Sequence, residues 1–190
     1  MKKIQKIFLT GIILFLLSGV DNSKASEIDE YSLNRARELF YKSIEDKDHI
    51  PEAIELFEKL KDNEALTGRV TTYLGALTAL KGRFAFWPQK KLALANKGLA
   101  MMDEGILTSP DDVEALFVHG STCYYLPFFF GRKDDAIRSL KRIIHLLPEQ
   151  MYRYDPDLTN NVINFIKENV ELEPVEIEKL NSIQGLLALG

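Results

Sequence analysis

Apolar residues recur along most of this chain at the three- and four-residue spacing of an amphipathic helix. Leu33, Ala36, Leu39, Phe40 and Ile44 follow that spacing. Alternation of apolar and polar residues over more than four positions, which would indicate a strand, is hard to find. The pattern therefore predicts an all-α protein.

Helix start and stop signals divide this pattern into eight predicted helices. Six of them cover 33–44, 70–82, 91–108, 109–126, 134–148 and 156–167. The other two begin at Pro51 and Pro174. Gly82 is expected to end the third helix, and Asp111 with Glu114 resembles the capping box that opens the fifth. Short connections between helices of this length favour antiparallel neighbours.

Two glycines fall in the middle of predicted helices, at Gly75 and Gly120. A glycine inside a helix costs about 1 kcal/mol relative to alanine. We therefore expect a neighbouring helix to come close to the backbone at both positions.

A short motif repeats along the chain. Residues 53–60 (AIELFEKL) and 136–143 (AIRSLKRI) share the same order of small, apolar and basic positions, and 98–105 (GLAMMDEG) is a weaker copy. Pro110 and Pro148 each lie twelve residues after the first residue of a copy. Such repetition is typical of proteins built from stacked helical units.

Over residues 33–148 the chain resembles the tetratricopeptide repeat family. The Leu74-Gly75 pair matches the first helix of that repeat, the small residues Ala53, Gly98 and Ala136 match the start of its second helix, and the prolines match its end. The early tryptophan of the family is missing, and His119 replaces the leucine expected before Gly120.

The resemblance implies a tetratricopeptide-like stack of antiparallel helical hairpins, a right-handed α-solenoid, over residues 26–150. Residues 151–190 would add helices that cap the stack. Proteins of this family usually bind peptides or proteins on the concave face formed by their first helices, and they rarely do chemistry.

The first 25 residues have the layout of a secretory signal peptide. Lys2, Lys3 and Lys6 precede an apolar stretch at 7–20, and Ala25 precedes a predicted cleavage site. An uncleaved anchor is the alternative, but a membrane span needs about 20 residues. We therefore expect an exported protein, located in a periplasm or another extracytoplasmic space.

Charge and cysteine content narrow the class of partner. Removal of residues 1–25 takes away four lysines and one aspartate, so the net charge falls from −4 to −7. Such an acidic chain is a poor binder of nucleic acid, because phosphate contacts need a basic face. Cys123 is the only cysteine, so no internal disulfide is expected.

Two connections are longer than in the family, and both are aromatic. They cover 82–91 (GRFAFWPQKK) and 127–133 (PFFFGRK). Because equivalent loops of a stack lie on one edge, we expect the two loops to meet and their rings to form one patch. Aromatic rings with arginine are typical of interface hot spots. The predicted binding residues are Arg83, Phe84, Phe86, Trp87, Tyr124, Phe128, Phe129, Phe130 and Arg132.

Two other interpretations of these rings stay open. The rings can pack on one another and on the helix ends, because long loops need bulky side chains to fill them. Insertion into a membrane surface prefers a broad basic face, and four cations in an acidic chain do not favour it. No membrane contact is therefore expected after signal removal.

Candidate chemistry is sparse. His119 and Cys123 are four residues apart on one predicted helix and are able to meet, but the segment also matches the packed first helix of the repeat. His49, His119 and His145 lack metal-ligand spacing, and no phosphate-binding loop is evident. The sequence predicts no catalytic residue, metal or cofactor.

These observations predict a non-enzymatic adaptor that binds another envelope protein or a peptide, with self-association as a further possibility. The analogy with exported tetratricopeptide proteins implies an accessory role in a transport or secretion assembly. The alternative is a small-molecule-binding protein, in which the aromatic loops and Arg83 or Arg132 form a pocket.

Overall fold

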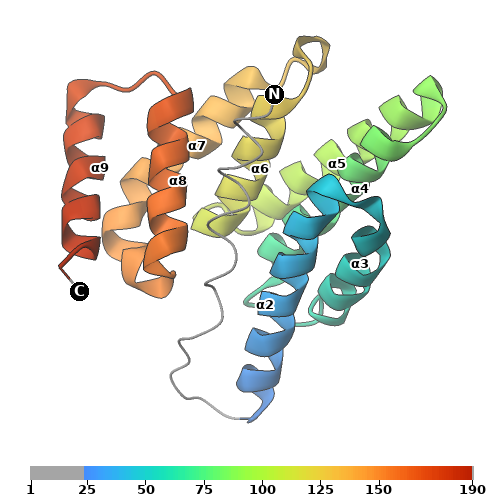
Figure 1. Cartoon of the computed structure of the whole chain (residues 1–190), viewed down its shortest axis with the longest axis horizontal. Helices are drawn as coiled ribbons and strands as arrows, with labels where there is room; N and C mark the ends of the chain where they lie inside the picture. The colour runs from blue at the N-terminus through green and yellow to red at the C-terminus, as the bar shows by residue number, and fades with distance from the viewer. Residues whose placement is uncertain (1–23, 190) are drawn as a thin grey trace.

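The computed structural model describes residues 24–189, and this part of the chain is all-helical without a strand, as the sequence predicts (Figure 1). Residues 1–23 of the predicted signal peptide lie outside the described residues. The α-helices are α2 (Lys24–Glu45), α3 (Ile50–Lys59), α4 (Thr67–Phe84), α5 (Pro88–Thr108), α6 (Val113–Tyr125), α7 (Lys133–Gln150), α8 (Pro156–Asn169) and α9 (Pro174–Leu187). Three short 3-10 helices are η1 (Lys47–His49), η2 (Phe128–Phe130) and η3 (Met151–Arg153).

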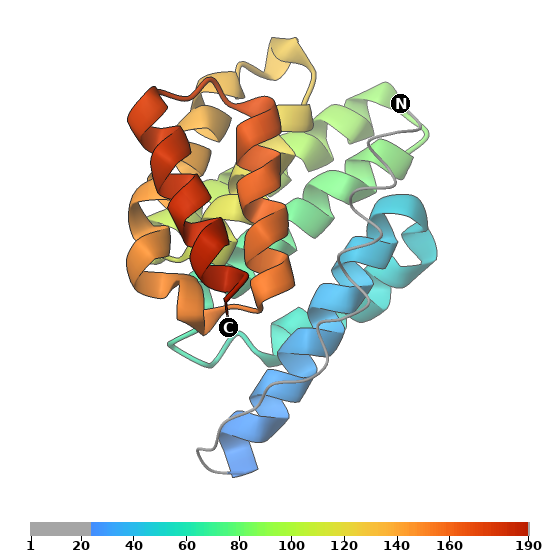
Figure 2. The same cartoon turned by 60° about the vertical axis from the view of Figure 1, so that its left-hand side comes forward.

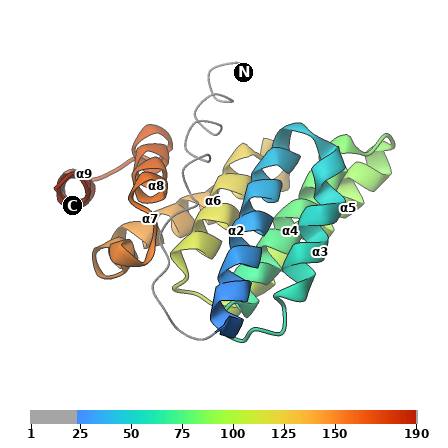
Figure 3. The same ribbon diagram turned by 60° about the horizontal axis from the view of Figure 1, so that its bottom comes forward.

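Successive helices pair as antiparallel hairpins, α2 with α3, α4 with α5, α6 with α7 and α8 with α9 (Figures 1 and 2). The α4–α5 contact is the most extensive, and α4 also packs against α2, α3 and α6. Seen from the end of the bundle, α9 lies at one edge and α5 at the other (Figure 3). The hairpin connections 85–87 and 126–132 lie at one end of the helices, which we call the tip end. The links between hairpins lie at the opposite end.

Glycines allow a close approach of helices in the α4–α5 and α6–α7 hairpins. A Cβ on Gly75 would lie 2.7 Å from the carbonyl oxygen of Gly98 on α5, and a Cβ on Gly120 would lie 2.9 Å from Cγ of Leu140 on α7. Real Cβ atoms do not come so close to other atoms, so both helical glycines are explained by a neighbouring helix. The expectation of close approach at Gly75 and Gly120 is confirmed.

The predicted end of α4 at Gly82 is wrong. The helix continues to Phe84, and α5 begins at Pro88 rather than at 91. A Cβ on Gly82 would lie 2.8 Å from the carbonyl oxygen of Lys91, so this glycine serves helix packing rather than helix termination. Most of the predicted loop 82–91 is therefore helix, and the α4–α5 hairpin is lengthened instead.

Two further boundary predictions are wrong. Asp112, not Asp111, caps α6, because its carboxylate accepts a hydrogen bond from the backbone N–H of Ala115 at 2.8 Å. Pro148 does not end α7, which continues to Gln150. Asp112 and Gln150, at these two helix ends, both line the cavity described below.

Two apolar cores meet at α6 and α7. The first lies among α2–α5 and includes the fully buried Phe57, Tyr73 and Met102. The second lies among α6–α9 and includes Ile144 and Ile163. The last two helices thus pack on the α6–α7 hairpin through a core of their own.

Candidate functional site

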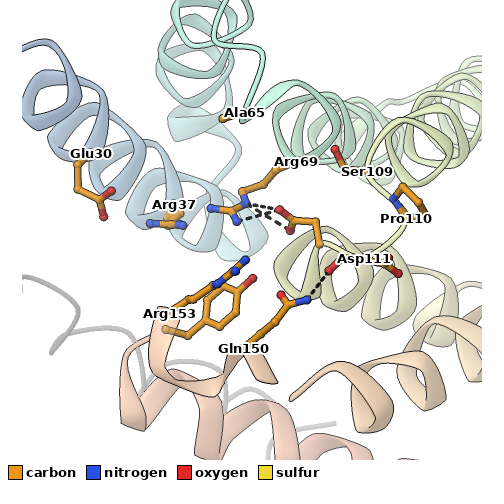
Figure 4. A pocket seen from close by; sticks show the side chains of 11 residues that line it. Glu30, Arg37, Ala65, Arg69, Ser109, Pro110, Asp111, Gln150 and Arg153 are labelled. Carbon is orange, nitrogen blue, oxygen red and sulfur yellow. Dashed lines mark hydrogen bonds and ion pairs between the residues drawn. The ribbon is translucent and has the colours of Figure 1, made fainter. Parts of the chain in front are cut away.

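A cavity of about 440 Å³ lies at the end where the hairpins are linked, opposite the tip end (Figure 4). We call it the arginine cavity. Its wall comes from α2, the start of α4, the α5–α6 link and the end of α7 with η3 and the residue that follows. The lining residues are Glu30, Arg37, Ala65, Arg69, Ser109, Pro110, Asp111, Asp112, Gln150, Arg153 and Tyr154.

Glu114 organises the charges behind this wall. Its side chain is buried on α6, and Arg37 of α2 donates from Nε to Glu114 Oε1 at 2.6 Å. The hydroxyl of Tyr73 on α4 donates to the same oxygen at 2.6 Å. Nη1 of Arg69 lies 3.1 Å from Glu114 Oε2. One carboxylate therefore ties together the first helices of three successive hairpins.

The surroundings keep Glu114 ionised. Burial alone would raise its pKa, but the charges of Arg37 and Arg69 and the hydrogen bonds to it lower the pKa to about 2. Burial also disfavours the charged form of Arg37, and Glu114 more than offsets this, so the pKa of the guanidinium lies above its usual value. At neutral pH this network neither gains nor loses a proton.

Asp112 joins the network to the helix cap. While it caps α6, it also accepts a hydrogen bond from Nη2 of Arg69 at 2.8 Å. Arg69 is thereby held between two carboxylates, those of Asp112 and Glu114. Its guanidinium is fixed at the cavity wall by contacts that need no ligand.

Arg153 differs from the other two arginines of the cavity. It is exposed, and it makes no hydrogen bond or ion pair with any described residue. In Figure 4 its side chain extends toward Arg69, whereas Glu30 lies on the far side. Among the described residues that line the cavity, Arg153 is thus the one cation that no neighbouring side chain already neutralises, and it lies beside a rigid charged wall.

The predicted aromatic residues lie at the tip end, and four of their rings face solvent. The exposed fractions are 84% for Phe86, 64% for Trp87, 95% for Phe128 and 65% for Phe129. Within each tip the rings touch: Phe86 and Trp87 have centroids 5.1 Å apart, and Phe128 and Phe129 6.1 Å apart. Among the described rings, no contact joins one tip to the other, so the rings form two separate groups and not the single patch that we expected.

The other predicted site residues serve mainly to hold the tips in place. Phe84, Tyr124 and Phe130 are partly buried against the first core. Nη1 of Arg83 donates to the carbonyl oxygen of Ile44 at 3.0 Å, which attaches the α4–α5 tip to the end of α2. The predicted set therefore divides into exposed rings and structural supports.

Arg132 belongs to the supports as well. It forms an ion pair with Asp103 of α5, and its Nε lies 2.9 Å from Asp135, although this second contact is poorly aligned for a hydrogen bond. These carboxylates already pair with the guanidinium. Through Asp103, Arg132 links the α6–α7 tip to α5.

His119 and Cys123 do meet, but in a buried cluster. Cys123 Sγ lies 3.8 Å from Nε2 of His119, whose Nδ1 lies 2.8 Å from Ser139 Oγ. Burial raises the pKa of the Cys123 thiol to about 11 and lowers the pKa of His119. The thiol is therefore protonated at neutral pH and only 1% of the cysteine is exposed, which suits packing rather than nucleophilic attack.

Sequence reasoning missed the arginine cavity. It interpreted Glu114 only as part of a capping box, whereas Glu114 is just 6% exposed. A signal was present at Glu114, which lies between Val113 and Ala115, but not at Arg37, whose neighbours include Arg35 and Glu38. The partner of such a charge lies 77 positions away in the chain, and helical spacing does not reveal that pairing.

Comparisons with known proteins found no match: no family model fits the sequence, and neither a curated protein nor a solved structure is similar to it. Among the described residues, no helix is long and apolar enough to cross a membrane. In the same part of the chain, no group of three His, Cys, Asp or Glu side chains is placed to hold a metal ion.

Proposed function

We propose that this protein is a non-enzymatic binding protein of the cell envelope, built as a tetratricopeptide-like right-handed stack of hairpins. It takes an acidic residue of an extended segment of a partner protein into the arginine cavity. The observation that carries the proposal is Arg153, a cation without a described partner beside the fixed Arg37–Glu114–Arg69 network. A carboxylate placed there gains a charge-assisted hydrogen bond.

The position of the cavity supports a protein partner. Its wall includes α2 and α4, the first helices of two hairpins, which is the face that proteins of the resembled family use for peptides. The wall is preorganised, because Arg69 and Arg37 are already held by carboxylates. A rigid wall lowers the entropy that binding must remove.

The state of the charges supports binding rather than catalysis. Glu114 has a pKa of about 2, so it does not exchange protons near neutrality. The envelope location rests on the pattern of residues 1–25, and a role in a transport or secretion assembly rests on family analogy alone.

Selection from a displayed library of random peptides tests the proposal. The library is selected on the full-length wild-type protein alone, and each enriched peptide is then measured on wild type and on the Arg153→Glu variant. We expect enriched peptides to share an acidic residue and to bind Arg153→Glu at least about tenfold more weakly, since charge reversal replaces attraction by repulsion. The matched control is a Trp87→Ala/Phe129→Ala variant, altered only at the tips, which should bind as wild type does.

Enriched peptides that bind wild type and Arg153→Glu equally would refute the cavity as the site, and a library without any enriched peptide would refute the peptide-binding function.

A second candidate function is the binding of a small carboxylate in the same cavity. A volume of about 440 Å³ falls in the range of small-molecule sites. We therefore place the small-molecule site in the arginine cavity rather than beside Trp87. Titration with succinate distinguishes the two candidates. Saturable binding of succinate without any enriched peptide would support the small-molecule function instead.

A further inference from the structure

The exposed rings at the tip end are not needed to fill a core. Phe86, Trp87, Phe128 and Phe129 are each at least 64% exposed, and Leu92 on the neighbouring turn of α5 is 48% exposed. Large apolar side chains gathered at one end of a molecule usually mark a contact surface. Because both tips point to the same end of the molecule (Figures 1 and 2), a single surface is able to meet both.

Positive charge is concentrated around the first tip although the whole chain is acidic. From Lys81 to Lys91 the sequence contains four Lys or Arg residues and no Asp or Glu. The second tip is close to neutral, because Arg132 and Lys133 are followed directly by Asp134 and Asp135. The net charge of the chain therefore conceals a cationic α4–α5 tip.

The lysines beside the first tip are available to a partner. Lys81, Lys90 and Lys91 are exposed and contact no described carboxylate. Lysines elsewhere contrast with them, because Lys42 and Lys59 each form an ion pair with a glutamate one helical turn away. Arg83 and Arg132 are already engaged by Ile44 and Asp103, so the lysines supply the free charge.

Acidic residues flank the two tips at the same end. The α2–α3 turn carries Glu45, Asp46 and Asp48, and the α8–α9 turn carries Glu171 and Glu173. These groups oppose an anionic partner on either side. They restrict such a partner to the two central hairpins, which are the ones that carry the exposed rings.

We infer that the α4–α5 and α6–α7 tips dock the protein on an anionic lipid surface, with their rings inserted at the headgroup level and the lysines against the lipid charges. Exposed aromatic rings beside cations are the combination that interfacial anchors use. A bilayer also accepts two separate protrusions independently, whereas a folded protein partner would need a matching recess for each. It replaces the expectation from the sequence that no membrane contact is made, because the exposure of the four rings and of the lysines beside them is visible only in the structure. This inference does not depend on the arginine cavity.

Tryptophan fluorescence of the full-length protein tests the inference, since Trp87 is the only tryptophan. The probes are vesicles of phosphatidylcholine alone and of phosphatidylcholine mixed with phosphatidylglycerol, each also prepared with brominated acyl chains. We expect the emission of Trp87 to shift to the blue and to be quenched by bromine only with the anionic vesicles. Because bromine quenches only a nearby ring, quenching reports the insertion of Trp87 itself and not merely attachment of the protein through residues 1–23.

Charge variants sharpen the test. Lys90→Glu/Lys91→Glu should weaken vesicle binding by about tenfold or more, because two attractive contacts become repulsive. Arg153→Glu, at the far end, should change it by less than about twofold, since salt screens charges beyond about 10 Å. Glu171→Gln should strengthen binding, because it removes a flanking negative charge.

Ring variants complete the test. Phe86→Ser/Phe128→Ser retains Trp87 as the probe and should reduce both the affinity and the quenching. Equal binding to neutral and anionic vesicles, or equal loss in the Lys90→Glu/Lys91→Glu and Arg153→Glu variants, would overturn the inference. A change in Trp87 emission with protein concentration in the absence of vesicles, abolished by Phe86→Ser/Phe128→Ser, would overturn it in favour of contact between two copies.

Discussion

The two ends of the hairpins differ in which side chains they bury and which they expose. At the cavity end, Arg37, Arg69 and Glu114 are buried or nearly so and are fully engaged with one another. At the tip end, Phe128 and Trp87 face solvent and the lysines near them lack ion-pair partners among the described residues. Charge lies inside at one end, and apolar surface lies outside at the other.

This difference separates what holds the fold from what remains for a partner. A buried charge that lost its counterion would be strongly unfavourable, so the network at the cavity end constrains how α2, α4 and α6 pack. Exposed rings add nothing comparable to the folded state, since they bury little surface on folding. The side chains at the tip end are thus available to bind a partner. At the cavity end, mainly Arg153 is available in this way.

The largest expected effect is at the cavity end. Glu114→Gln should lower the free energy of unfolding by about 3–5 kcal/mol, because the buried Arg37 and the partly buried Arg69 lose the counterion that they share, although Arg69 keeps the carboxylate of Asp112. Urea denaturation followed by circular dichroism measures it. The matched control is Glu55→Gln, which removes an exposed ion pair with Lys59 and should leave the denaturation midpoint unchanged. A midpoint shift as small for Glu114 as for Glu55 would show that the network does not hold the hairpins together.

Acid should weaken the same end. The folded-state pKa of Glu114 is about 2, below its ordinary value of 4.5, so its contribution to stability is complete above pH 4.5 and is lost as the pH falls toward 2. The free energy of unfolding, measured across this range, should fall more steeply for wild type than for Glu114→Gln. Carboxylates elsewhere contribute equally to both proteins. Parallel pH profiles would contradict the assignment.

The smallest expected effect is at the tip end. Phe86→Ser and Phe128→Ser should each change the free energy of unfolding by no more than about 0.5 kcal/mol, as is usual for exposed positions. Phe57→Ala is the matched control for an aromatic ring in the core, and it should cost about 3–5 kcal/mol because that ring is fully buried. A loss at Phe86 comparable to that at Phe57 would mean that the exposed rings support the fold.

Local patterns were reliable where a single helix decides the outcome. Helical spacing predicted an all-α chain, and the glycines at 75 and 120 predicted close helix contacts. The same reasoning failed at Gly82, because a glycine that ends a helix and one that admits a neighbouring helix look alike in sequence. The exposure of Trp87 and the attachment of Arg132 likewise depended on neighbours distant in the chain.

The sequence by itself determined the helices, the small residues at their contacts and the clustering of aromatic and basic residues in two short runs, since each follows from neighbours within a few positions. Only the tertiary structure decided that Glu114 joins Arg37 across 77 positions and that the four exposed rings lie at the end opposite this network. Those outcomes depend on which helix faces become adjacent. Burial can shift the pKa of a charged group, and a counterion can pair with it, only once that packing exists.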